Sequence, residues 1–320
     1  MKNKIYALLL MVLSSILMSS CENDQEPILP MPTLENVEVG LNNNEIGIIG
    51  RDFHVNADII AGDKIDLVKV KMLPIEGENY TSPWKFELTW EQYKGAKNTN
   101  LHKHFTIPED AVEGRYDFII VIQDENGTTL EEKRAINIYA PENLPVDPKL
   151  TEFTVSARGE SFKVLYILSK GGYRDPISLE YGNFQVGIDK GEVLDAAATV
   201  GGIKGEGKLY VLLINKKHNH RPESIDAIDF TKAMVVDVFE HKNLEQTERW
   251  SHINFEREGF PIISRLKIGA EKDNNSPIPA TISGLKEWES GDYYVGTIYH
   301  NSTYNMTIFH YVGVEVNMDL

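Results

Sequence analysis

The sequence predicts an all-β protein, and three observations support this fold class. Short runs of alternating apolar and polar residues recur along the chain, with the period of two that is typical of half-buried strands. Turn-forming residues separate these runs at the intervals expected for a sandwich. A segment with three prolines, residues 141–149, divides the chain. We therefore expect an immunoglobulin-like β-sandwich over residues 34–140 and a second, larger mostly-β domain over residues 150–320.

The first domain contains seven predicted strands, which is the number found in an immunoglobulin-type sandwich. They cover residues 34–39, 53–60, 64–74, 84–90, 101–107, 115–123 and 129–138. Asn126-Gly127 indicates a hairpin before the last of them, because this pair tolerates the positive φ angles of a type I′ turn. In the immunoglobulin order, the second and fifth strands are antiparallel neighbours in one sheet, and we expect strand 84–90 beside them.

The second domain is longer and less regular, and it fits a β-sandwich with insertions. The expected strands cover residues 161–168, 177–186, 208–215, 233–239, 262–268, 293–299 and 307–316. We also expect a helical turn around residues 193–198 or 223–231.

The N-terminus has the pattern of a lipoprotein signal peptide over residues 1–20. Two lysines precede an apolar stretch, residues 5–18, that is too short for a comfortable membrane-spanning helix. Leu17-Met18-Ser19-Ser20-Cys21 resembles a lipobox, which implies cleavage before Cys21 and acylation of its thiol. Cys21 is the only cysteine of the chain, so the mature protein has no intrachain disulfide despite its oxidising surroundings.

An acidic, proline-rich tether, residues 21–33, follows the expected cleavage site. Its Glu22-Asn23-Asp24-Gln25-Glu26 segment resembles an export signal to the outer cell surface. We expect an outer-membrane protein that is lipid-anchored and exposed at the cell surface, with the periplasmic face as the alternative. Loss of two positive charges, Lys2 and Lys4, takes the net charge from −16 to −18, which disfavours nucleic-acid binding.

Histidines on the second and fifth strands predict a metal site. Residues two apart in a strand point to the same face, so His102 and His104 project together. The apolar alternation in strand 53–60 directs His54 and Asp58 to the same solvent face. Three imidazoles on neighbouring strands suit Zn²⁺ or Cu²⁺, and Asp58, or Glu87 from strand 84–90, would add a carboxylate. The alternative is a set of solvated surface histidines.

A second pair, His218 and His220, is a weaker candidate for a second metal. Lys216, Lys217 and Arg221 surround it, and cations disfavour the binding of another cation. His241 and His252 follow within a few dozen residues, but nothing in the sequence fixes their geometry.

Several motifs of the first domain, about residues 31–140, resemble the Bacteroidota lipoprotein family with domain of unknown function 4625. The motifs are Gly50-Arg51-Asp52-Phe53-His54, His102-Lys103-His104, Ile107-Pro108-Glu109-Asp110-Ala111, Gly114-Arg115-Tyr116, and Val121-Ile122-Gln123-Asp124 before Asn126-Gly127. The resemblance implies an extracytoplasmic sandwich on a lipid anchor and supplies no activity. It also implies association with an outer-membrane uptake system, such as a TonB-dependent receptor.

The sequence favours a binding protein over an enzyme. It contains no Gly-x-Ser-x-Gly elbow, no His-Glu-x-x-His motif and no phosphate-binding glycine loop. The alternative to a metal binder is a glycan- or protein-binding adaptor without a metal. Trp288 and Tyr294 are the candidate ligand aromatics, because they flank the Glu289-Ser290-Gly291-Asp292 turn.

Overall fold

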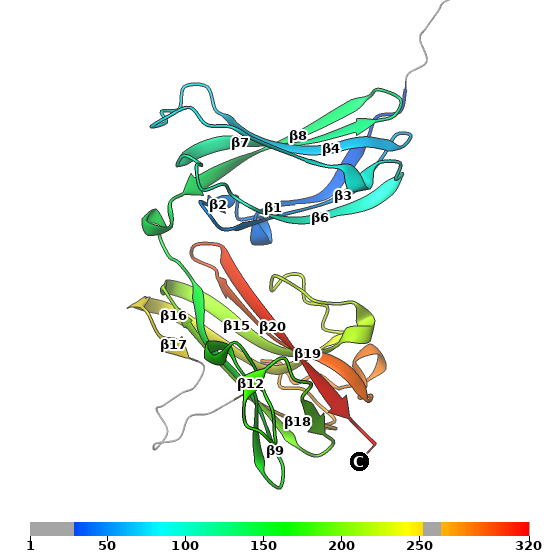
Figure 1. Ribbon diagram of the computed structural model, residues 1–320, viewed down its shortest axis with the longest axis vertical. Coiled ribbons are helices and arrows are strands. Elements are labelled where there is room, and N and C mark those ends of the chain that lie inside the picture. Colours follow the sequence, from blue (N-terminus) through cyan, green and yellow to red (C-terminus); the bar gives the residue numbers. More distant parts are fainter. Residues whose placement is uncertain (1–28, 252–263, 320) are drawn as a thin grey trace, which may run out of the picture.

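The computed structural model describes residues 29–251 and 264–319 and is nearly all β. Two β-rich bodies, one above the other in Figure 1, are joined by the chain that runs from β8 through η3 to β9. The predicted signal peptide, Cys21, most of the tether and His252 lie outside the described residues. In the part of the chain that is described, no helix has the length and apolar character needed to cross a membrane.

The first domain is a sandwich of two sheets. One sheet has the order β1-β3-β6 and the other β2-β8-β7-β4-β5, with β2 parallel to β8. The elements are β1 (Thr33–Val39), η1 (Leu41–Asn43), β2 (Ile46–Ile48), β3 (Asp52–Ile60), β4 (Ile65–Pro74), β5 (Phe86–Trp90), η2 (Glu91–Tyr93), β6 (Asn98–Thr106), β7 (Gly114–Asp124), β8 (Thr129–Tyr139) and η3 (Pro141–Asn143).

Alternation along β3 produces the core expected from the sequence. Phe53, Val55, Ala57 and Ile59 are all buried between the two sheets, where Leu101 of β6 and Phe118 of β7 join them. Burial of such side chains is the main favourable term in folding, worth about 1.5–3 kcal/mol for each large one. The predicted antiparallel pairing of the second and fifth strands is confirmed, because β3 pairs with β6.

The expected position of strand 84–90 is wrong. The observed strand, β5, pairs with β4 in the opposite sheet. Its apolar side chains do pack toward the core, so the residue pattern was compatible with an edge position in either sheet.

The second domain is also built from two sheets around one core. One sheet has the order β12-β11-β10-β9-β14-β17, with β18 also on β14, and the other β13-β20-β19-β15-β16. The elements are β9 (Lys149–Arg158), β10 (Phe162–Ile167), η4 (Leu168–Lys170), β11 (Gly172–Arg174), β12 (Tyr181–Gly182), β13 (Gly187–Asp189), β14 (Val193–Gly201), β15 (Ile203–Asn215), η5 (Lys216–His218), β16 (Ala233–Thr247), β17 (Trp250–Ser251), β18 (Ser264–Lys267), η6 (Gly284–Lys286), β19 (Gly291–Asn301) and β20 (Met306–Asn317).

Three local expectations for the second domain are wrong. Residues 193–198 form a strand rather than a helical turn, because the alanines of β14 pair with β9 and pack in the core. Residues 223–231 form bends and turns. Most of the expected strand 177–186 is irregular, and only Tyr181–Gly182 pairs as β12.

The outer face of the β1-β3-β6 sheet is turned toward the second domain (Figure 1). Asn42 of η1 and Asn305 of the β19–β20 turn exchange hydrogen bonds of 3.0 and 3.3 Å. Arg51 forms a bidentate ion pair with Asp147, which lies in the connection between the domains. The expected solvent face is therefore partly covered by the second domain: only 4% of the His54 side chain is exposed, whereas 49% of the His102 side chain is.

Candidate metal centre

Strand pairing places the three first-domain histidines on one face. His54 of β3 lies directly opposite His104 of β6, and Asn56 lies opposite His102. The ring centroids of the three imidazoles are 5.0–5.4 Å apart. Gly50 precedes β3 with a φ of +73°, a backbone conformation that glycine adopts without strain.

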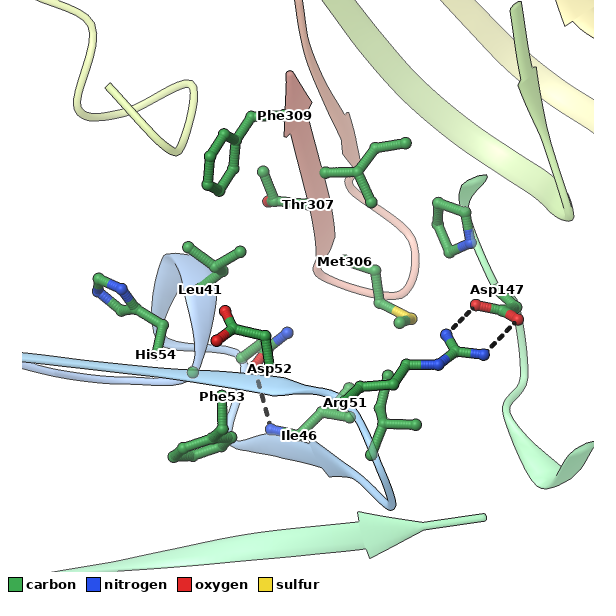
Figure 2. Close-up of a pocket in the computed structure, with 15 residues that line it drawn as sticks. Leu41, Ile46, Arg51, Asp52, Phe53, His54, Asp147, Met306, Thr307 and Phe309 are labelled. Atoms are coloured by element: carbon green, nitrogen blue, oxygen red, sulfur yellow. Dashed lines mark hydrogen bonds and ion pairs between the residues drawn. The ribbon is translucent and has the colours of Figure 1, made fainter. Parts of the chain in front are cut away.

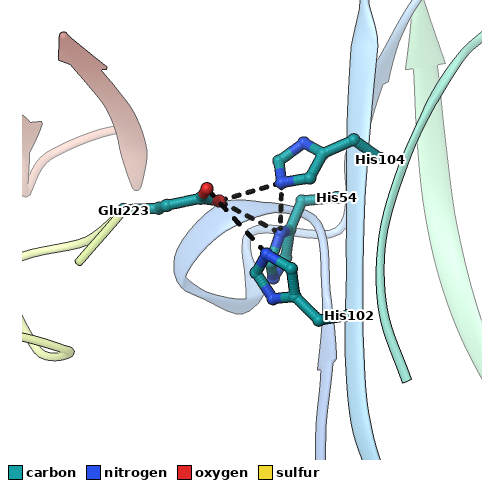
Figure 3. A group of neighbouring side chains, drawn as sticks. All are labelled: His54, His102, His104 and Glu223. Carbon is teal, nitrogen blue, oxygen red and sulfur yellow. Dashed lines mark hydrogen bonds and ion pairs between the residues drawn. The ribbon is translucent and has the colours of Figure 1, made fainter. Parts of the chain in front are cut away.

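The fourth member of the group, Glu223, comes from the second domain. It lies in the segment between η5 and β16, and its carboxylate reaches the three imidazoles from the opposite side (Figure 3). The phenol of Tyr311 donates to the Pro222 carbonyl oxygen at 2.5 Å, and Ser224 is buried on the other side. Ile225 and Ile228 pack into a small apolar cluster on β15, β16, β19 and β20. Glu223 is thus presented on a fixed loop.

The four residues fit a divalent transition metal. Each offers one ligand atom, and these four atoms lie within 4.8 Å of one another. His54 Nδ1 is 3.3 Å from His104 Nε2, and Glu223 Oε2 is 2.9 Å from His104 Nε2 and 3.6 Å from His54 Nδ1. Zinc bonds of about 2.0–2.1 Å place neighbouring ligand atoms about 3.3 Å apart in a tetrahedron. These three distances therefore approximate one tetrahedral face.

His102 completes the group from its more exposed side. Its Nε2 lies 3.9 Å from Glu223 Oε1, and 49% of its side chain is exposed. Its ligand atom lies within the same 4.8 Å as those of the other three residues. Within the described residues, this is the one group of three or more His, Cys, Asp or Glu side chains with metal-ligand geometry.

Two further carboxylates lie behind the imidazoles, and one of them, Asp52, is hydrogen-bonded to its ring. Asp52 Oδ2 lies 2.5 Å from His104 Nδ1, the nitrogen that faces away from Glu223. Glu38 Oε2 lies 3.5 Å from His54 Nε2, a charge contact longer than an ordinary hydrogen bond. Carboxylates behind ligating imidazoles fix the tautomer and the ring orientation, and they raise the basicity of the ligand. This arrangement is typical of histidine metal sites.

In the metal-free protein, the same contacts stabilise the protonated form of His104. Hydrogen bonds to Asp52 and Glu223 raise the pKa of His104 to about 10. Burial alone would raise the pKa of Glu223, but the hydrogen bond from His104 and the nearby imidazoles lower it overall. For His102, burial outweighs the attraction of Glu223 and lowers the pKa. A metal ion at this site must therefore displace a proton from His104.

The carboxylates that the sequence suggested lie elsewhere. Asp58 is on β3 with the histidines, but its carboxylate accepts hydrogen bonds from Asn36 and Asn100, both at 2.8–2.9 Å. Glu87 is on β5 in the other sheet, near Lys69. The carboxylate is supplied instead by Glu223, 119 residues from His104 in sequence. Residues 223–231 were expected to form a helical turn, and no spacing in the sequence links Glu223 to His104.

In the second histidine pair, His220 is bonded to the backbone. His220 Nε2 accepts a hydrogen bond from the Asp229 backbone N–H at 3.0 Å, which closes the loop that carries Glu223. His241 is buried against Trp250. Its Nδ1 lies 3.0 Å from Gly205 O, and its Nε2 lies 3.0 Å from the Tyr299 hydroxyl oxygen. Within the described residues, neither His218 nor His220 belongs to a group of three or more metal-ligating side chains.

Trp288 and Tyr294 do not form a shared aromatic surface. Trp288 packs against the core between the two sheets, and its indole N–H donates to Ala270 O at 2.8 Å. Tyr294 lies with the separate apolar cluster beneath the Glu223 loop, next to Tyr311 and the guanidinium of Arg221. A sugar-stacking site built from these two rings has no support in this geometry.

A cavity between the domains adjoins the histidines. Figure 2 shows His54 and Leu41 on one side, the Arg51–Asp147 ion pair on the other, and Met306, Thr307 and Phe309 of β20 above. A second, more polar cleft is lined by Glu38, His102, Arg221 and Glu223, and it leads directly to the candidate ligands.

Comparison with known proteins gives a family-model match that is confined to the N-terminal part of the chain. Residues 19–139 match the model of a family described as "Domain of unknown function (DUF4625)". No curated protein matches the chain. Among solved structures, the chain is similar to one titled "Crystal structure of dimeric latent PorU from Porphyromonas gingivalis", at 9% identity and a TM-score of 0.28. The match covers 93% of this chain and 21% of that chain, and this low TM-score supports no inference.

Proposed function

We propose that this protein binds one divalent transition metal, zinc or copper, through His54, His102, His104 and Glu223. The observation that carries the proposal is the convergence of four ligand atoms within 4.8 Å, with Asp52 behind one imidazole. Imidazole and carboxylate ligands suit both metals, and intrinsic affinity favours Cu²⁺ over Zn²⁺. The role is binding rather than catalysis.

The experiment is a calorimetric titration of a soluble form, residues 27–320, with Zn²⁺ and Cu²⁺, together with metal analysis after dialysis. We expect one metal ion per chain. The His102→Ala/His104→Ala double variant removes two of the four ligands and should retain none. Absence of binding above background in the unchanged protein would overturn the proposal and leave a metal-free adaptor as the working function.

We further propose that the metal site operates outside the cytoplasm, on a lipid anchor at Cys21. The supporting pattern is the lysine-flanked apolar stretch that ends at this cysteine, followed by an acidic, proline-rich tether. Such a protein would act at the cell surface beside an outer-membrane receptor of the TonB-dependent class, in the uptake of a metal or nutrient.

The anchor can be tested by membrane fractionation of cells that produce the Cys21→Ser variant. The unchanged protein should sediment with the outer membrane, and the variant should not be acylated or retained there. Ser20→Ala is the matched control and should remain anchored. A variant that stays acylated and membrane-bound would contradict the assignment of Cys21.

A further inference from the structure

The candidate ligands are divided between two bodies that touch at few polar points. Three imidazoles project from β3 and β6 of the first domain, and the carboxylate of Glu223 projects from the second. Direct polar contacts between the domains, besides those of Glu223, include the exchange between Asn42 and Asn305. These part-buried hydrogen bonds between amide groups are worth about 0.5–1.5 kcal/mol each. A metal ion at the boundary would be a much stronger link.

The positions of these contacts suggest which side would open. Asp147 belongs to the connection between the domains, and its backbone N–H donates to Gly202 O of the second domain. The Arg51–Asp147 ion pair therefore lies beside the connection, whereas His54 lies across the cavity from it (Figure 2). Separation of Glu223 from the histidines would open the cavity and expose Leu41, Met306 and Phe309.

We propose that the metal acts as a clasp, so that its binding closes the two domains over the cavity between them. This inference rests on the proposed metal site and adds the consequence of its division between domains. The open form offers three imidazoles, and the closed form offers these and the carboxylate. A ligand shifts a conformational equilibrium by the ratio of its affinities for the two forms. If Glu223 makes binding about 100-fold tighter, saturating metal raises the ratio of closed to open form about 100-fold.

The loop that carries Glu223 is packed on the second domain, so a metal that binds the carboxylate also positions that domain. Tyr311 and the packing of Ile225 and Ile228 hold the segment on the second domain. A glutamate on a loose loop would reach the metal without moving its domain. Here the carboxylate cannot follow the histidines unless the second domain does so too.

The chain is well suited to a direct measurement of this closure. Its one cysteine is Cys21, so residues 27–320 contain none, and two spin labels can be introduced at chosen sites. Thr129→Cys on β8 and Ser169→Cys on η4 replace exposed residues, one in each domain. Pulsed electron paramagnetic resonance then gives the distribution of interdomain distances with a chelator or with saturating Zn²⁺.

In the chelator, the His104–Glu223 contact and a few polar contacts are what hold the domains together, so we expect a broad distribution there and a single narrow one with Zn²⁺. The Glu223→Gln variant keeps the three imidazoles, so it should still bind Zn²⁺, but more weakly. Its interdomain distance distribution should remain broad even when Zn²⁺ is saturating. The control Glu289→Gln changes an exposed carboxylate of the same domain and should close as the unchanged protein does.

Zinc uptake is measured on the same labelled samples, which separates the two proposals. One bound ion without any narrowing of the distribution would overturn the clasp and leave the metal site intact. Full closure in Glu223→Gln would also overturn it, because the clasp requires this carboxylate. Absence of zinc binding would overturn the metal site and the clasp together.

Discussion

His102-Lys103-His104 and His218-Asn219-His220 space two imidazoles identically, but the first lies in β6 and the second at the end of η5. The extended backbone of β6 sends both side chains to one face, where His54 of the paired strand meets them. Asn219 has a left-handed backbone conformation, with φ 46° and ψ 40°, so the chain turns between His218 and His220. There His220 accepts a backbone hydrogen bond and shapes the loop that carries Glu223. The spacing of ligand residues predicts a site only together with the backbone conformation between them.

The largest expected effect separates the two pairs directly. His102→Ala/His104→Ala removes two ligands and should weaken zinc binding by more than about 100-fold, since even outer-sphere partners account for about 10–100-fold. His218→Ala/His220→Ala removes no ligand and loses only the hydrogen bond that closes the Glu223 loop, so it should weaken zinc binding by no more than about tenfold. Isothermal titration calorimetry measures both. Equal losses in the two double variants would contradict the assignment of the site to β3 and β6.

A smaller effect is expected from the carboxylate behind His104. Asp52→Asn keeps the size of the side chain but removes the charge that orients the imidazole, and it should weaken zinc binding by about 10–100-fold. Asp58→Asn is the matched control on the same strand, and its carboxylate is bonded to Asn36 and Asn100. A weakened Asp58→Asn with an unchanged Asp52→Asn would instead support the carboxylate that the sequence suggested.

The pH dependence should follow His104. Its pKa of about 10 in the metal-free protein means that zinc binding expels a proton at neutral pH. Apparent affinity should therefore rise about tenfold per pH unit between pH 7 and 9. Titrations in buffers with different ionisation enthalpies count the released protons directly. An affinity that does not change over this range would mean that His104 is not a ligand.

The raised pKa also predicts how pH affects the stability of the metal-free protein. Because the folded-state pKa of His104 lies above its ordinary value of 6.5, its stabilising contribution is full below pH 6.5 and is lost as pH rises through about 10. The melting temperature of the metal-free protein should fall over this range, and Asp52→Asn should flatten the fall. A fall of the same size in Asp52→Asn would assign the effect to other groups.

The smallest expected effect concerns the loop pair. His220→Ala removes the acceptor for the Asp229 backbone N–H, which should cost about 1 kcal/mol of the free energy of unfolding. His218→Ala should change it by less than about 0.5 kcal/mol, as surface substitutions usually do. Urea denaturation followed by circular dichroism measures both. An unaffected His220→Ala would remove the structural role given to this histidine.

The half of the site that lies in the first domain could be predicted from the sequence. Alternation in strand 53–60 fixed which residues face the core, and the immunoglobulin-type order placed His54 beside His102 and His104. Glu223 could not be predicted, because its position depends on the packing of one domain on another. Pattern and spacing act within a strand or between paired strands, and neither describes how two separate bodies meet.

The same limit explains the errors in the fold. The alanines of β14 have high helix propensity, but pairing with β9 and burial in the core outweigh that preference. Trp288 is a candidate ligand aromatic because it flanks a turn, yet its partly buried ring packs against the core. In each case, contacts between residues distant in sequence decided the outcome.

The most direct test of the metal centre is X-ray diffraction from crystals of residues 27–320 grown with Zn²⁺, with data collected on both sides of the zinc absorption edge. The account predicts one strong anomalous peak per chain, bounded by His54 Nδ1, His102 Nε2, His104 Nε2 and the Glu223 carboxylate, at about 2.0–2.2 Å from each. Crystals without a peak there, or with zinc bound only at other residues, would contradict it.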